Sequence, residues 1–211
     1  MPDFSLLLQE FITLWVVIDP IGTLPVFIAA TAAIPAAKRR GVALRAVLVA
    51  FIVLLAFIVL GQLVLEGLGL ELQSFQIAGG IILFLFALTM IFGPGKPETD
   101  LGGSDQAKNI AVFPVAMPSI ASPGAMLAVV ILTDNDRFAI SHQIMTSALM
   151  ALVLAATLAI LLAAAPIMRV IGQTGAAVIS RVMGMLLAAV AVDAVLNGLV
   201  GIGVIAPFQA T

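Results

Sequence analysis

Long apolar runs separated by short polar stretches dominate the chain. A run of about 20 apolar residues forms a helix that matches the hydrocarbon core of a bilayer. The pattern predicts six transmembrane helices, over residues 4–33, 43–65, 73–93, 110–132, 142–165 and 177–204. The first run is too long for one straight crossing at about 1.5 Å per residue. We therefore expect it to be tilted, broken or extended into an interfacial segment.

The composition agrees with a membrane protein. Of the 211 residues, 63% are hydrophobic and 9% are charged, whereas a water-soluble domain needs a charged surface. The early charges are Asp3 and Glu10, so the first run lacks the basic flank of a cleaved signal peptide. The formal net charge of −2 and the lack of a basic patch give no support for a nucleic-acid partner. No cysteine and one histidine, His142, exclude disulfides and argue against a histidine metal centre or a Ser-His-Asp triad.

Lysine and arginine gather at one end of the predicted bundle. Arg137 alone lies in a loop at the other end, and the remaining eight are Lys38, Arg39, Arg40, Arg45, Lys96, Lys108, Arg169 and Arg181. The positive-inside rule makes these eight cytoplasmic. We therefore expect a multi-pass protein of the inner (cytoplasmic) membrane with both termini on the periplasmic side.

The predicted outer loops carry acidic residues. Glu66, Glu71, Asp134 and Asp136 are expected to be solvated loop charges. His142 lies at the outer end of the fifth predicted helix. An interfacial position without a special role is favoured for it over a proton sensor.

Two motifs of the first half each have a similar counterpart in the second half, at nearly the same distance along the sequence. IDPIGTLPVFIAA at 18–30 aligns with ASPGAMLAVVIL at 121–132, and IAGGIILFLFALTMIFG at 77–93 aligns with RVMGMLLAAVAVDAVLNG at 181–198, at offsets of 103 and 104. These matches indicate an internal repeat of three helices, and an odd number of helices inverts the second half. The prediction is one integral membrane domain with a first repeat at 1–93, a cytoplasmic linker at 94–109 and a second repeat at 110–211.

Proline and glycine interrupt the first and fourth predicted helices. The residues concerned are Pro20, Gly22 and Pro25 in the first, and Pro114, Pro118, Pro123 and Gly124 in the fourth. Proline removes a backbone donor and clashes with the preceding turn, and the freed backbone groups cannot face lipid. Broken helices at matching positions of inverted repeats indicate a central transport site. Kinks that serve only packing are the alternative.

Two carboxylates fall at membrane depth. Asp19 lies near the middle of the first predicted helix, where a charge costs at least ~2.5–3.5 kcal/mol. It is expected to bind a solute or coupling ion, to cap the half-helix that begins at Pro20, or to do both. Asp193 has Asn197 one turn on, and a binding role and a structural pair both remain open for it.

The candidate substrate or ion site comprises Asp19, Pro20, Gly22, Thr23, Ser119, Ser122, Pro123, Gly124, Asp193 and Asn197. Gly79, Gly80 and Gly184 are expected to serve close helix packing.

Four motifs together resemble the MarC/SnatA family of bacterial and archaeal inner-membrane proteins, in the LysE-like transporter grouping. They are IDPIGTLPVF, IAGGIILFLFALTMIFG, AMPSIASPGAM and ISRVMGMLLAAVAVDAVLNG, and the resemblance runs from about residue 5 to 203. It implies six helices and transport of small neutral amino acids such as glycine and alanine. The family takes its name from a multiple-antibiotic-resistance locus, which does not by itself imply drug efflux.

The resemblance also assigns positions. Asp19, Pro20 and Gly22 match the first-helix signature, in which Asn or Asp precedes the proline, and the fourth-helix signature is matched by Pro123 and Gly124. Ser122 stands where the family commonly has glycine. Relatives often have an uncharged polar residue at the position of Asp193. These differences put the substrate and the coupling ion in question more than the fold.

These observations together predict a secondary transporter of small neutral amino acids, ion-coupled, with the substrate near the bilayer midplane. No enzyme activity, metal or cofactor is expected, apart from H⁺ or Na⁺ as a coupling ion. The expected partners are the lipid bilayer and a small-molecule solute, and a homo-oligomer stays open. A non-transporting scaffold or regulatory protein, and an exporter of other small metabolites or drugs, are the alternatives.

Overall fold

The computed structural model describes residues 4–31, 34–92 and 109–206. Within these ranges every regular element is helical and none is a strand. The elements are α1 (Phe4–Ile18), α2 (Thr23–Ala30), α3 (Ala36–Gly67), α4 (Leu72–Phe92), η1 (Ala111–Ile120), α6 (Pro123–Leu132), α7 (Ile140–Leu162) and α8 (Ala164–Gly201). The predicted linker at 94–109, with Lys96 and Lys108, lies outside the described residues except for Asn109.

Five segments of the described chain are long and apolar enough to cross a membrane. They are Phe4–Ile28, Ala36–Gly67, Leu72–Phe92, Ile140–Leu162 and Ala177–Gly201. The pair formed by η1 and α6 is bent by 55° and makes a sixth if it is counted as one span. The predicted all-α fold is confirmed for the described residues, with five or six candidate spans where the sequence predicts six.

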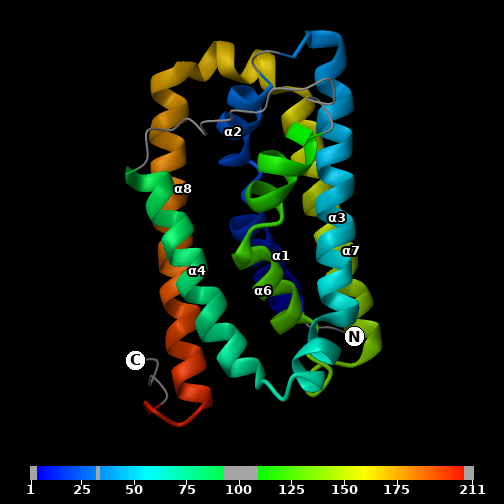
Figure 1. The fold of residues 1–211 in the computed structure, drawn as a ribbon, viewed down its shortest axis with the longest axis vertical. Coiled ribbons are helices and arrows are strands. Elements are labelled where there is room, and N and C mark those ends of the chain that lie inside the picture. The colour runs from blue at the N-terminus through cyan, green and yellow to red at the C-terminus, as the bar shows by residue number, and fades with distance from the viewer. Residues whose placement is uncertain (1–3, 32–33, 93–108, 207–211) are drawn as a thin grey trace.

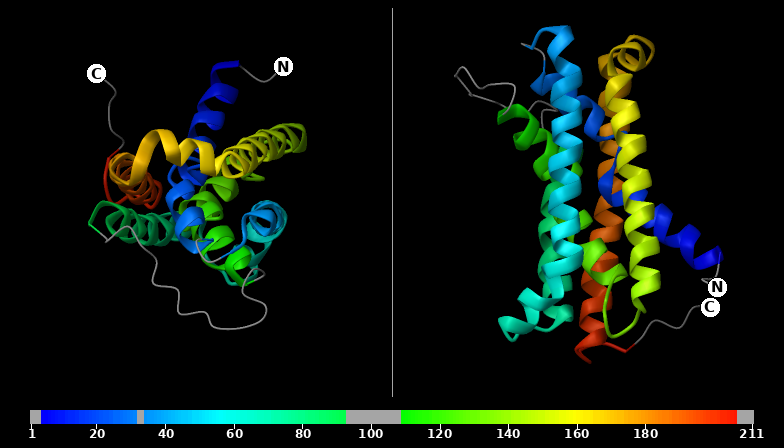
Figure 2. Two further views of the ribbon diagram at one scale, coloured as in Figure 1. Left: turned by 90° about the horizontal axis from the view of Figure 1, so that it is seen from above. Right: turned by 90° about the vertical axis from the view of Figure 1, so that its right-hand side faces the viewer.

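The helices follow one long axis and form three groups. α3 and α7 lie on one side, α4 and α8 on the other, and α1, α2, η1 and α6 fill the middle (Figure 1; Figure 2). The contacts agree, because α4 packs mainly on α8, while α3 packs on η1 and α7, and α1 packs on α7 and α6. The start of α1, the α6–α7 loop and the end of α8 share one end of the bundle, called here the α1-start end.

Proline makes η1 irregular. Phe113 (φ −133°, ψ 125°) and Met117 (φ −128°, ψ 129°) have extended backbone inside this segment, and each precedes a proline. A proline ring clashes with the helical conformation of the residue before it. Regular α-helix resumes only at α6, where Pro123 stands in the first turn, a position at which its missing N–H does no harm.

α8 contains a sharp turn at Gly172. This residue has φ +68° and ψ 175°, a conformation that glycine adopts readily because it has no Cβ. The part of α8 before the turn runs across the end of the bundle opposite the α1-start end (Figure 1). The part after it, Ala177–Gly201, is long and apolar enough to cross the membrane.

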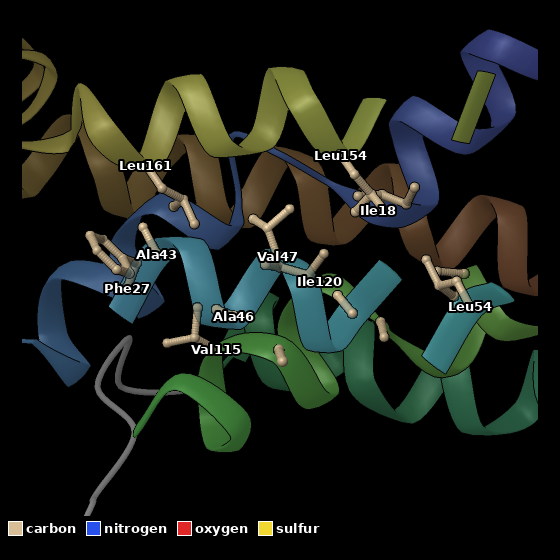
Figure 3. Close-up of a cluster of buried hydrophobic side chains, with 14 of the residues drawn as sticks. Ile18, Phe27, Ala43, Ala46, Val47, Leu54, Val115, Ile120, Leu154 and Leu161 are labelled. Carbon is tan, nitrogen blue, oxygen red and sulfur yellow. The ribbon is translucent and has the colours of Figure 1, made fainter. Parts of the chain in front are cut away.

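The main apolar core joins the central elements to α3 and α7. Ile18 of α1, Phe27 of α2 and Ile120 of η1 belong to one cluster of buried side chains with Leu54 of α3 and Leu154 of α7 (Figure 3). A second, smaller cluster joins α4 to α8 and consists of Leu83, Ala87, Leu187 and Ala191. Large apolar side chains are exposed on the outer faces of α3, α4, α7 and α8. The protein therefore contacts the lipid bilayer along these faces.

Glycine lets α4 and α8 approach closely. A Cβ atom built on Gly80 would lie 2.8 Å from Ala191 O, and one built on Gly184 would lie 3.1 Å from Ala87 O. Gly79 faces α6 instead, where a Cβ would lie 3.1 Å from a Leu127 methyl carbon. The three glycines thus sit at helix contacts.

We predict that Gly80→Ala destabilises the protein. The added methyl group would meet Ala191 O and Val195 Cγ2, both at 2.8 Å, and overpacking of this kind costs about 1–3 kcal/mol. Gly41→Ala in α3 is the matched control, because nothing lies within 4 Å of its Cβ. That change should be neutral or stabilising by about 0.5–1 kcal/mol. Thermal unfolding in detergent, followed by Trp15 fluorescence, compares the two, and equal Tm values would contradict the close approach of α4 and α8.

Candidate functional site

Asp19 ends one helix and caps the next. Its φ of +49° lies in the left-handed region, which Asp and Asn adopt more readily than other non-glycine residues. The Asp19 N–H donates to Trp15 O at 3.0 Å and closes α1. Its Oδ1 accepts a hydrogen bond from Gly22 N at 2.8 Å, and its carbonyl accepts from Thr23 N at 3.0 Å. Regular helix therefore begins at Thr23 rather than at Pro20, which lies in the intervening turn.

Gly22 is required by the position of the Asp19 carboxylate. A Cβ built on Gly22 would overlap Asp19 Oδ2. Any side chain at this position must displace either the carboxylate or the turn.

Ser122 performs the corresponding task at the start of α6. Its Oγ accepts a hydrogen bond from Ala125 N at 3.0 Å and donates to Val17 O at 2.9 Å. Val17 O is one of the last carbonyls of α1, which have no partner inside their own helix. One hydroxyl therefore satisfies the end of α1 and the beginning of α6 together.

A second hydroxyl pair links α2 to η1. Ser119 Oγ donates to Thr23 Oγ1 at 3.1 Å, and Thr23 Oγ1 donates to Ser119 O at 3.4 Å. Asp19, Thr23, Ser119 and Ser122 are all buried, with exposed fractions of 3, 1, 8 and 1%. These four residues define the crossing, the place where the α1–α2 interruption meets the η1–α6 interruption.

The structure brings eight of the ten predicted site residues to the crossing. Pro20 and Gly22 are buried in the first interruption, and Pro123 opens α6 directly after Ser122. Gly124 is held against α4, since a Cβ on it would lie 2.5 Å from a methyl carbon of Leu83.

Asp193 and Asn197 lie elsewhere. Both side chains are exposed on α8, whereas the crossing is buried. Asn197 Nδ2 donates to Asp193 Oδ2 at 2.8 Å, as their spacing of one helical turn allows. The structure therefore does not join this pair to the crossing.

A buried polar cluster in α1 and α7 was missed. Glu10 is 1% exposed, and its Oε1 lies 2.6 Å from His142 Nε2. Its Oε2 accepts a hydrogen bond from Thr146 Oγ1 at 2.9 Å, and the Phe138 ring stacks on the imidazole at a centroid distance of 4.3 Å. His142, for which the sequence favours an interfacial position without a special role, therefore contacts a buried carboxylate. A glutamate inside an apolar run needs a partner, and that requirement was the available signal.

Asp134 corrects a further expectation. It is 4% exposed rather than solvated, and its Oδ1 accepts from Gln62 Nε2 at 2.7 Å and from Asp136 N at 2.9 Å. Its Oδ2 lies 3.3 Å from Arg137 Nε. Two hydrogen bonds and an ion pair compensate for the burial of this carboxylate.

The remaining acidic loop residues, Glu66, Glu71 and Asp136, are exposed as expected. With Asp134 and Arg137 they line a pocket of about 430 Å³ at the α1-start end. Across the described ranges, no group of three or more acidic, histidine or cysteine side chains is arranged to hold a metal ion.

Comparison with known proteins identifies relatives over nearly the whole chain. A family model described as MarC family integral membrane protein matches residues 4–203. The chain is 33% identical over 202 residues to a UPF0056 membrane protein of Archaeoglobus fulgidus, with 92% of each chain covered. It is 32% identical to UPF0056 membrane protein YhcE of Escherichia coli, covering 95% of this chain and 94% of that protein. It is 29% identical to UPF0056 inner membrane protein YhgN of the same species, covering 92% and 95%. No solved structure gives a significant match.

Ser122→Ala should lower stability more than a serine change elsewhere in the bundle. The change leaves Val17 O and Ala125 N without their side-chain partner in a buried place, which costs about 1–3 kcal/mol. Ser147→Ala is the matched control, because Ser147 Oγ bonds only to Gln143 O of its own helix, at 2.7 Å. Thermal unfolding in detergent measures both variants. A Ser122→Ala protein as stable as Ser147→Ala would show that the crossing does not depend on this hydroxyl.

Proposed function

The chain belongs to the MarC family of integral membrane proteins, and we propose that it is a secondary transporter of small neutral amino acids, glycine- or alanine-like, driven by an ion gradient. The observation that carries this proposal is the burial of Asp19, Thr23, Ser119 and Ser122 at one place between two interrupted spans. Polar groups at membrane depth are expensive and tend to mark solute or ion pathways. Packing alone would be served by uninterrupted helices with apolar side chains, which need no such polar groups.

The proposal includes an inverted repeat, which the contacts at the two interruptions support. Asp19 Oδ1 bonds to Gly22 N, three residues further on, and Ser122 Oγ bonds to Ala125 N, also three residues further on. The two pairs are related by the 103-residue offset of the sequence motifs. Equivalent positions thus cap the chain in the same way.

The contacts between α4 and α8 support the same symmetry. Gly80 lies against Ala191 O, and Gly184 lies against Ala87 O. Both Gly80 with Gly184 and Ala87 with Ala191 differ by the offset of 104. Reciprocal contacts of this kind are expected where a two-fold axis in the membrane plane relates two antiparallel helices.

The dimensions of the crossing favour a small solute. Gly22 leaves no room for a side chain beside Asp19, and a Cβ on Gly124 would meet Leu83 at 2.5 Å. The start of α6 offers backbone N–H groups and the positive end of a helix dipole to a carboxylate. Asp19 or the carbonyls at the end of α1 would accept the ammonium group. Because the four polar side chains are buried, the helices must separate for a solute to enter.

We further propose that both termini face the periplasm. Lys38, Arg39, Arg40 and Arg45 belong to the first part of α3, at the end of the bundle opposite the α1-start end (Figure 1). Arg137 lies at the α1-start end. This asymmetry follows the positive-inside rule.

Cysteine labelling tests this orientation. The chain has no native cysteine, and residues 38 and 136 are both exposed at opposite ends of the bundle. In intact cells, an impermeant thiol reagent should label Asp136→Cys and leave Lys38→Cys unlabelled until the membrane is opened. The reverse pattern would invert the proposed topology.

Transport in liposomes tests the function. The purified protein should take up labelled glycine or alanine above the level of protein-free liposomes when a pH or Na⁺ gradient is imposed. Folded protein without uptake of either probe under any gradient would contradict the transporter proposal and favour a scaffold or regulatory protein.

Asp19→Asn separates charge from capping. Asparagine can still accept the Gly22 N hydrogen bond, so the fold should persist while the negative charge is lost. We expect gradient-driven uptake to fall by about tenfold or more, as for the loss of a charged hydrogen bond. Asp136→Asn, in the exposed loop, is the matched control and should retain uptake. Unchanged uptake by Asp19→Asn would limit Asp19 to capping.

A further inference from the structure

Glu10 is the more deeply buried of the two carboxylates in α1 and its following turn, at 1% exposure against 3% for Asp19. It precedes Asp19 by nine residues, which places it roughly 13 Å nearer the start of α1 along the helix axis. Its two side-chain partners, His142 and Thr146, both come from α7. The interrupted spans do not need this cluster for their capping, so it requires its own explanation.

We propose that Glu10 and His142 form a proton-binding site, and that its occupancy controls the contact between α1 and α7. The coupling of this site to solute movement rests on the proposed transport function. Proton binding itself does not, and it can be tested separately.

The geometry fits a shared proton. A separation of 2.6 Å between Glu10 Oε1 and His142 Nε2 requires a hydrogen on one of the two atoms. With a carboxylate and a neutral imidazole the pair carries one negative charge. When one further proton binds, the pair becomes neutral overall, either as carboxylate with imidazolium or as carboxylic acid with imidazole. Histidine is the side chain that changes charge between about pH 5 and 8.

The charge of the pair determines how well it tolerates burial. A net negative charge away from water is costly unless it is compensated. Loss of the proton therefore favours water entry between α1 and α7, and uptake of the proton favours the closed contact. Thr146 holds the second carboxylate oxygen, and the stacked Phe138 ring fixes the plane of the imidazole.

Within the described residues, no charged group other than His142 forms a hydrogen bond or ion pair with Glu10. α7 carries no further titratable residue, and α2 and α6 carry none. In the α6–α7 loop, Asp134 is paired with Arg137, and Asp136 is exposed. On α8, Asp193 bonds to Asn197, and Arg169 and Arg181 are exposed. On α3, which packs on α7, the basic residues lie at the opposite end and Glu66 is exposed.

The proton site and the crossing share one rigid element. α1 is held to α7 at Glu10 and to α6 by the hydrogen bond from Ser122 Oγ to Val17 O. A helix transmits a displacement of one end to the other. Movement of α1 away from α7 would therefore disturb the crossing from the α1-start end.

The lone tryptophan provides a readout that needs no transport. Trp15 lies on α1 between Glu10 and Asp19, half-buried and 5.9 Å from the Phe11 ring centroid. The wild-type protein in detergent should show one sigmoidal change in Trp15 emission when the pH is varied over the range in which the protein stays folded. Glu10→Gln and His142→Gln should each abolish this change, while Asp136→Asn should retain it.

Size-exclusion profiles and thermal unfolding verify that each variant is folded. If Glu10→Gln does not fold, His142→Gln provides the test. A wild type without the transition, or a folded variant of the pair that keeps it, would overturn the proposal.

Liposome assays with labelled glycine and alanine then test coupling. A pH gradient should stimulate uptake by Glu10→Gln at least about tenfold less than uptake by the wild type. Exchange of the probe at equal pH on both sides should be retained. A Glu10→Gln protein that remains as strongly stimulated as the wild type would overturn the coupling. If the wild type moves neither probe, the transport proposal fails, whereas the fluorescence titration still decides whether the proton site exists.

Discussion

The hydrogen bond from Ser122 Oγ to Val17 O joins the end of α1 to the start of α6. The terminal backbone groups at these ends have no hydrogen-bond partner within their own helix. In water such ends could be solvated, but inside a bilayer every backbone polar group must be satisfied by the protein. Two interrupted spans can therefore be placed in a membrane only if they meet and satisfy each other. The packing of α1, α2, η1 and α6 in the middle of the bundle follows from this requirement, and α3, α7, α4 and α8 shield the meeting place from lipid.

The sequence predicted the membrane class and the helical segments well, because hydropathy over about 20 residues reflects a strong physical constraint. It also singled out the residues of the crossing, since proline, glycine and an isolated aspartate are conspicuous within apolar runs. The sequence predicts that the second half-helix begins at Pro20, whereas α2 begins at Thr23. The left-handed conformation of Asp19 explains the difference, because the chain forms a turn over residues 20–22 before it returns to right-handed helix.

Contacts between residues far apart in the sequence could not be predicted from the hydropathy pattern. Glu10 and His142 are separated by 132 residues, and each alone looks like a charge near a helix end. The polar neighbours of Asp134 in the loop predict a solvated carboxylate, yet Gln62 of α3 donates a hydrogen bond to it. In both cases the partner lies on another helix, and periodicity along one helix carries no information about which neighbour it meets.

The two interruptions share a capping pattern but differ in charge, and this difference bears on what the crossing can bind. Asp19 brings a carboxylate to the first interruption, whereas Ser122 caps α6 with a neutral hydroxyl. The positive end of the α6 dipole is therefore not neutralised by its cap. One side of the crossing favours a cation and the other favours an anion. An amino acid carries both charges on adjacent atoms, so a small zwitterion matches this polarity better than a metal ion or an uncharged drug would. Two aspartates would attract a cation alone, and two serines would leave an ammonium group without a counter-charge. Under the proposed function, the combination of Asp19 with Ser122 thus favours a solute that carries both a positive and a negative charge.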